Sequence, residues 1–101
     1  MKTVTVCGSM RFAKDMQEIA FALETQQGYN VLCCIAAPEH AVLTDRDRER
    51  LSLAHRRKIE LSDGIYVVNI GGYIGESTQA EIHYAQSLSK EIIMHHPDAQ
   101  A

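Results

Sequence analysis

The chain has 101 residues, of which 46% are hydrophobic and 23% charged, with a formal net charge of −3. This composition is typical of one globular domain with a single core. The acidic balance disfavours binding to a nucleic acid polymer, and the sequence has neither a secretory signal nor an apolar run of about 18 residues that would span a membrane. We therefore expect a cytoplasmic protein without a membrane partner, in which residues 1–96 form the domain and 97–101 a flexible tail.

The first half of the chain predicts a strand, a helix and a second strand. Thr3–Cys7 is a β-branched run that ends in the turn signal Gly8-Ser9. A helix ending at Gly28 is expected next, since apolar residues recur there at helical spacing. These residues are Phe12, Met16, Ile19, Ala20 and Leu23. Residues 29–35 then form a further apolar run, closed by Pro38, that predicts a buried strand.

The second half repeats this alternation. Thr44 and Asp47 match a capping box that begins a charged helix. The expected inner stripe of that helix is Leu51, Ala54, Lys58 and Leu61. Gly64–Asn69 is a nearly continuous apolar run, typical of a strand covered on both faces. A helix from about Thr78 to Ser89 and a strand at Glu91–Met94 complete a βαβαβαβ order. This order predicts an α/β fold, a small Rossmann-like (flavodoxin-like) three-layer sandwich with a four-stranded parallel sheet.

Two glycine-bearing turns, Gly8-Ser9 and Gly71–Gly75, follow predicted strands. Ligands of parallel sheets bind beyond the carboxyl ends of the strands, and the unpaired N–H groups at a helix start suit a phosphate or another anion. The predicted binding residues are Gly8, Ser9, Arg11, Gly75, Ser77 and Thr78. The alternative for the first turn is a plain strand–helix connection, with Ser9 as a cap and Arg11 in solvent.

Glu81 is the candidate catalytic acid because it follows the glycine-rich loop closely. Thr78 and Glu81 also match a capping box, so the sequence leaves a structural role for Glu81 equally open. His55 likewise is either a site residue or a histidine with a structural or solvated position on its helix. We expect no metal and no cofactor, because neither the three cysteines nor His95-His96 show ligand spacing. Cys7, Cys33 and Cys34 are interpreted as buried free thiols.

Three segments, Val6–Arg11, Leu61–Val68 and Gly75–Ala85, resemble the nucleoside 2-deoxyribosyltransferase superfamily, which includes deoxynucleoside 5′-monophosphate N-glycosidases. The resemblance implies that Glu81 matches the family's catalytic glutamate, which attacks the anomeric carbon of a deoxyribosyl group and displaces the base. It also implies that Gly8, Ser9 and Arg11 match the loop that holds the 5′ end or its phosphate, and that a neighbouring subunit helps to close the site. A sheet this small has exposed edges and faces to cover, which favours a homodimer or a higher homo-oligomer. The chain departs from the family at two positions. His55 stands near the place of the family's aspartate, where a histidine could act as general acid. Gly75 replaces a polar residue, which leaves phosphate binding to backbone N–H groups and Ser77.

The expected function is cleavage or base exchange at the N-glycosidic bond of a (deoxy)nucleoside or nucleoside 5′-monophosphate. Two alternatives stay open. One is a non-catalytic nucleotide-binding or signalling module with the same fold, favoured by the missing aspartate. The other is a phosphoribohydrolase of the lysine-decarboxylase-like group, whose Gly-Gly-x-Gly-Thr loop is roughly similar to residues 71–75.

Overall fold

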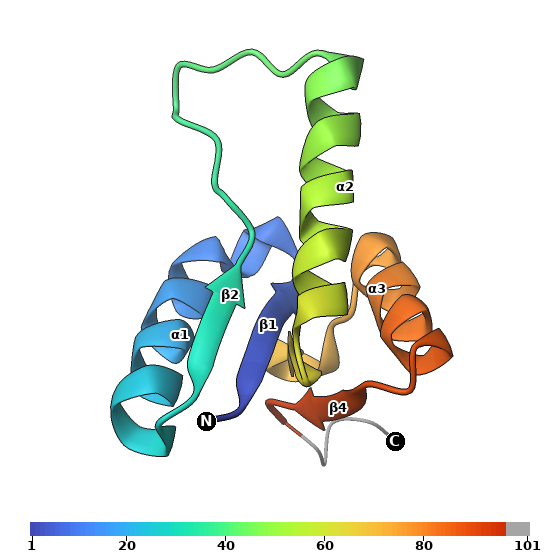
Figure 1. Cartoon of the computed structure of the whole chain (residues 1–101). Helices are drawn as coiled ribbons and strands as arrows, with labels where there is room; N and C mark the ends of the chain where they lie inside the picture. Colours follow the sequence, from blue (N-terminus) through green and yellow to red (C-terminus); the bar gives the residue numbers. More distant parts are fainter. Residues whose placement is uncertain (97–101) are drawn as a thin grey trace.

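The computed structural model describes residues 1–96, in which strands and helices alternate. The elements are β1 (Thr3–Gly8), α1 (Ala13–Gln27), β2 (Asn30–Cys33), α2 (Asp45–Leu61), β3 (Gly64–Val68), α3 (Glu76–Ser87) and β4 (Glu91–Met94). Short 3₁₀ turns at Met10–Phe12 and Ile70–Gly72 follow β1 and β3. All strand pairs are parallel, in the order β2-β1-β3-β4 (Figure 1). The predicted α/β fold with a four-stranded parallel sheet is confirmed.

The core lies on both faces of the sheet, because successive side chains of a strand point to opposite sides. On one face, Val4 and Val6 of β1 pack with Met16 and Leu23 of α1. On the other face, the buried residues come from β1, β3, α2 and α3, and they are Cys7, Ile59, Ile65, Val67 and Ala85. The layers are therefore α1, the sheet, and the pair α2 and α3. The predicted apolar stripe of α1 is confirmed.

The predicted inner stripe of α2 is wrong at three of its four positions. His55 and Ile59 are the buried residues of this helix, whereas Leu51, Ala54 and Leu61 are exposed. Lys58 is half-buried, and its ammonium donates to the Cys33 carbonyl at 2.9 Å. Figure 1 shows the reason, because α2 extends well beyond the carboxyl end of the sheet. Residues 45–54 are all exposed. Apolar side chains in that half of the helix have no sheet to pack on, so periodicity alone selected the wrong face.

Local signals at helix ends were predicted correctly at two places. The Thr44 N–H donates to Asp47 Oδ2 at 3.0 Å and the Asp47 N–H donates to Thr44 Oγ1 at 3.1 Å, which is the predicted capping box. These bonds lower the pKa of Asp47 from its usual value. Gly28 ends α1 in the left-handed conformation, at φ 71°, as the position of a glycine at a helix end predicts.

Gly64 lets β3 and β4 approach each other closely. A Cβ at this position would lie 2.7 Å from the backbone oxygen of Glu91. We expect Gly64→Ala to lower the free energy of unfolding by about 1–3 kcal/mol, since the two backbones must separate to admit the methyl group. Urea unfolding measures the loss. Gly75→Ala is the control, because its Cβ would meet the Tyr73 ring no closer than 3.5 Å. Equal losses for the two variants would contradict this account.

Two histidines lie at the C-terminal end of the described chain. His95 and His96 follow β4 at the edge of the sheet, where the Tyr66 hydroxyl lies 2.7 Å from His95 Nδ1 and Asn69 bonds the backbone of His96. The predicted tail, 97–101, lies outside the described residues. Within residues 1–96, no helix combines the length and the apolar character needed to cross a bilayer.

Candidate functional site

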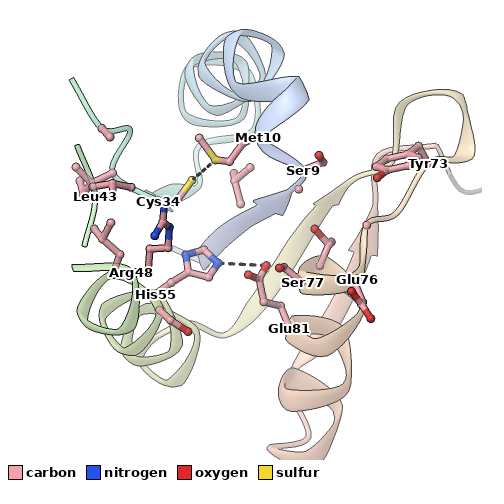
Figure 2. Close-up of a pocket in the computed structure, with 18 residues that line it drawn as sticks. Ser9, Met10, Cys34, Leu43, Arg48, His55, Tyr73, Glu76, Ser77 and Glu81 are labelled. Atoms are coloured by element: carbon pink, nitrogen blue, oxygen red, sulfur yellow. Dashed lines mark hydrogen bonds and ion pairs between the residues drawn. The ribbon is translucent and has the colours of Figure 1, made fainter. Parts of the chain in front are cut away.

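A cavity of about 590 Å³ opens at the carboxyl end of the sheet, between β1, α2 and the start of α3 (Figure 2). Its volume is in the range of small-ligand sites. Its lining contains every predicted site residue except Arg11, namely Gly8, Ser9, His55, Gly75, Ser77, Thr78 and Glu81. These residues come from distant parts of the chain. The topology therefore brings the two glycine-bearing turns to one cavity.

Arg11 lies outside that lining. Its side chain is exposed and its guanidinium carbon stacks 3.7 Å from the centroid of the Tyr73 ring, which itself lines the cavity. The Arg11 N–H donates to Ser9 Oγ at 3.4 Å. Ser9 thus caps the 3₁₀ turn, as the plain-turn alternative predicted. Arg11 reaches the cavity only through Tyr73.

Gly8 is needed for packing. A Cβ at this position would lie 3.0 Å from Met16 Sδ and 3.1 Å from Val68 Cβ. These neighbours belong to α1 and β3, so a side chain here would push against the core on both sides. Packing alone accounts for the glycine, although its backbone also lines the cavity.

The start of α3 differs from the sequence-based expectation. The helix begins at Glu76, with Gly75 as its N-cap and no side-chain bond to the cap. Thr78 is therefore inside the first turn and Glu81 is in the second, so the alternative capping box of Thr78 and Glu81 is wrong. Glu81 therefore does not have the helix-capping role that was the alternative to a functional one. The first N–H groups of α3 have no side-chain acceptor at the N-cap, and they adjoin the cavity beside Ser77.

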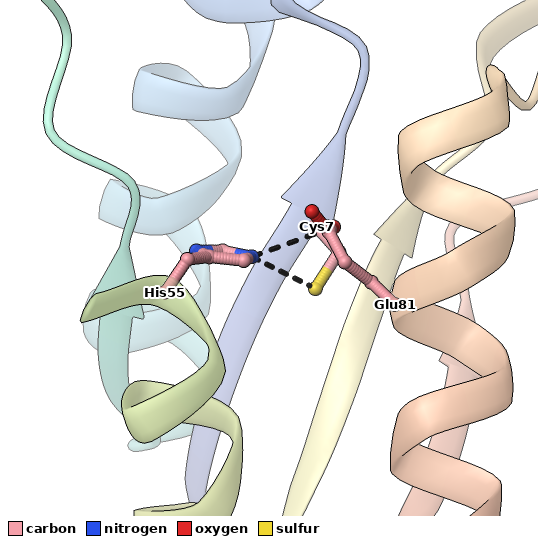
Figure 3. Close-up of side chains that lie close together, drawn as sticks. All are labelled: Cys7, His55 and Glu81. Carbon is pink, nitrogen blue, oxygen red and sulfur yellow. Dashed lines mark hydrogen bonds and ion pairs between the residues drawn. The ribbon is translucent and has the colours of Figure 1, made fainter. Parts of the chain in front are cut away.

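Two cavity-lining residues, His55 and Glu81, form a cluster with Cys7, which is buried behind the lining, and we call it the Cys7–His55–Glu81 cluster (Figure 3). His55 Nε2 lies 3.4 Å from Glu81 Oε1 and 3.5 Å from Cys7 Sγ. The three side chains project toward one another from α2, α3 and β1. Cys7 and His55 are buried, whereas the side chain of Glu81 is 25% exposed. Glu81 therefore has access to a ligand.

The electrostatics of the cluster make Cys7 a poor nucleophile. Burial, reinforced by the Glu81 carboxylate, raises the pKa of the Cys7 thiol well above its usual value. A thiol that stays protonated is unreactive, because the thiolate is the attacking species. His55 Nδ1 is buried and has no hydrogen-bond partner in the described part of the chain. A buried polar atom without a partner is costly to folding.

Four polar residues that line the cavity were not among the predicted site residues, namely Arg48, Ser52, Tyr73 and Glu76. Arg48 is 62% exposed and lies 3.5 Å from Asp45. Its place in the lining depends on α2 extending past the sheet, which no local pattern indicates. Cys7 was interpreted correctly as a buried thiol, but its spatial partners had no signal in the sequence.

A scan against models of protein families and a search of curated protein sequences each found no match to this chain. The resemblance to the deoxyribosyltransferase superfamily therefore stays a prediction, as does the homodimer. Any function must be argued from the cavity and the side chains within it.

Proposed function

We propose that this protein cleaves the N-glycosidic bond of a (deoxy)nucleoside or a nucleoside 5′-monophosphate, with Glu81 as nucleophile. The observation that carries the proposal is the position of the Glu81 carboxylate. It is partly exposed, free of any capping role, and lies in a cavity of ligand size beside a buried imidazole. A carboxylate with access to a ligand can attack an anomeric carbon, whereas a solvated surface carboxylate cannot hold a sugar in place.

The reaction proceeds in two displacements. In the first, a Glu81 oxygen forms a bond to the anomeric carbon while the glycosidic bond breaks, its electron pair leaving with the base. His55, which lies 3.4 Å from Glu81, supplies the proton to the departing base. In the second, a water attacks the anomeric carbon, His55 takes the water's proton, and the Glu81 carboxylate is released. The sum is hydrolysis, or base exchange if a second base replaces the water.

The 5′ end of the ligand is assigned to the start of α3. The N-cap Gly75 provides no side-chain acceptor for the first N–H groups of the helix, and Ser77 adds a hydroxyl in the cavity lining. Ser9 approaches the same cavity from the loop after β1. Backbone N–H groups at a helix start stabilise an anion through hydrogen bonds and the helix dipole. This favours a 5′-monophosphate as the better ligand.

The test is incubation with a panel of nucleosides, deoxynucleosides and their 5′-monophosphates, followed by chromatography for free base. Release of a base from at least one member, with the matching sugar or sugar phosphate, supports the proposal. A protein that shows no release and no exchange with any member, although correctly folded by circular dichroism, would rule it out.

Replacement of Ser77 tests the assignment of the 5′ end. We expect Ser77→Ala to raise KM for a monophosphate by about 10-fold, because a hydrogen bond to a charged group contributes about 1.5 kcal/mol. KM for the corresponding nucleoside should stay unchanged. Ser87→Ala, at the far end of α3, is the control, since within residues 1–96 the Ser87 hydroxyl bonds only the Tyr84 backbone oxygen. An equal rise for both substrates would place the phosphate elsewhere.

A second candidate is a nucleotide-binding module without chemistry. The observation favouring it is that Glu81 Oε1 already has His55 as a close neighbour and the carboxylate is three-quarters buried. Isothermal calorimetry with the same panel distinguishes the two candidates. Saturable binding of a nucleotide without base release would support the module over the enzyme.

A further inference from the structure

The Cys7–His55–Glu81 cluster is only partly satisfied by hydrogen bonds. Strong N–H···O bonds place the two heavy atoms about 2.7–3.2 Å apart, whereas His55 Nε2 and Glu81 Oε1 are 3.4 Å apart. Within residues 1–96, the Cys7 sulfur contacts His55 Nε2 at 3.5 Å and the Thr5 carbonyl at 3.8 Å. Three polar groups thus converge from three elements, and His55 Nδ1 has no hydrogen-bond partner in this part of the chain (Figure 3).

The same spacing matches the edges of a tetrahedral metal site. With zinc bonds of about 2.3 Å to sulfur and about 2.0–2.1 Å to nitrogen and oxygen, tetrahedral angles give a sulfur–nitrogen edge of about 3.5 Å and a nitrogen–oxygen edge of about 3.3 Å. The observed distances are 3.5 and 3.4 Å. All three donor atoms lie within 4.8 Å of one another. Binding requires the third edge, between Cys7 Sγ and the Glu81 oxygen, to close to about 3.5 Å, and the Glu81 side chain is 25% exposed at this position.

We propose that Cys7, His55 and Glu81 bind a zinc ion whose fourth coordination position faces the cavity. Thiolate sulfur, imidazole nitrogen and carboxylate oxygen are all zinc ligands. The sulfur disfavours magnesium and calcium, which prefer oxygen ligands alone. On binding, zinc displaces the Cys7 thiol proton to solvent, forming the zinc–sulfur bond without any change of oxidation state.

The zinc site is independent of the proposed glycosidase activity and would oppose it. A Glu81 oxygen that donates its electron pair to zinc is no longer free to attack an anomeric carbon. Zinc would therefore act as an inhibitor if the protein is a glycosidase. Because zinc binding is measured without any substrate, failure of one proposal leaves the other standing.

Cobalt provides the direct test. Chelator-treated protein is titrated with Co²⁺, and a near-ultraviolet charge-transfer band should grow to saturation at one ion per chain, since that band requires a thiolate ligand. Zinc should then abolish the band stoichiometrically, and Mg²⁺ should leave it intact. Cys7→Ser should remove the band and weaken zinc binding by more than about 100-fold, because loss of a mere supporting partner of a ligand already costs 10–100-fold.

Cys34→Ser is the control, since Cys34 lines the cavity but does not belong to the cluster. It should retain the band. Glu81→Gln, at a part-exposed position, keeps the Cys7 thiolate, so it should retain the band but bind cobalt more weakly. This variant tests the site even if Cys7→Ser does not fold. Absence of a saturable thiolate band in the wild type, or its loss in Cys34→Ser with retention in Cys7→Ser, would overturn the proposal.

Discussion

Glu81→Gln is expected to reduce base release by at least about 100-fold, which corresponds to roughly 2.7 kcal/mol of activation free energy. The amide matches the carboxylate in shape but cannot form the glycosyl ester that the first displacement requires. Binding of the substrate should change little, since the side chain keeps its volume. Steady-state kinetics of base release, with calorimetry for binding, measure the two quantities separately.

Gln79→Ala is the control for this variant, because Gln79 is exposed on α3 and is not among the cavity-lining residues. Its rate should equal that of the wild type. Glu76 offers a sharper comparison, since it is the other carboxylate in the lining. Loss of activity in Glu76→Gln with retention in Glu81→Gln would show that Glu76, and not Glu81, is the nucleophile. Equal rates for wild type and Glu81→Gln would exclude Glu81.

His55→Leu should have opposite effects on activity and on stability. Loss of the imidazole removes the proton donor, so base release should fall by about 100-fold, the lower bound usual for general acid catalysis. The free energy of unfolding should stay unchanged or rise. His55 is buried and its Nδ1 lacks a partner, and an apolar side chain of similar size avoids that penalty. Base release and urea unfolding measure the two effects.

Arg57→Ala, on the same helix, is the control for His55→Leu. The Arg57 side chain is 66% exposed and pairs with Glu60 at 3.1 Å, outside the cavity lining. Its loss should leave activity unchanged and shift stability by no more than about 0.5 kcal/mol. If His55→Leu instead loses stability and keeps its activity, His55 has a structural role and no part in the reaction.

Strand–helix order and several helix ends could be predicted because their causes are local. The apolar run of β1 ends at Gly8, that of β3 begins at Gly64, and the capping box at Thr44 involves only neighbouring residues. The start of α3 was harder. Gly75 and Thr78 are both acceptable caps by sequence, and in the folded protein Gly75 is the N-cap while Thr78 is buried in the first turn.

The candidate site was predicted in part. Parallel topology alone places Gly8, Ser9 and the start of α3 at one edge of the sheet, and the structure brings them to one cavity. The approach of Cys7 to His55 and Glu81 could not be predicted, because it depends on the rotation of α2 about its axis. That rotation buries His55 and Ile59 and exposes Leu61, whereas Leu51, one turn before His55, is exposed because it lies beyond the sheet. Periodicity predicted a different helix face.

In the projecting half of α2, residues that line the cavity are not part of the packed core. Arg48, Leu51 and Ser52 line the cavity yet are exposed on a stretch of helix that lies beyond the sheet. A substitution at these positions reshapes one wall without opening a hole in the core, so it costs little folding free energy. On the opposite wall, Gly8 is held by close packing and Thr78 is buried. Evolution can therefore change the shape of the cavity by altering one helix face while the surroundings of Glu81 stay fixed.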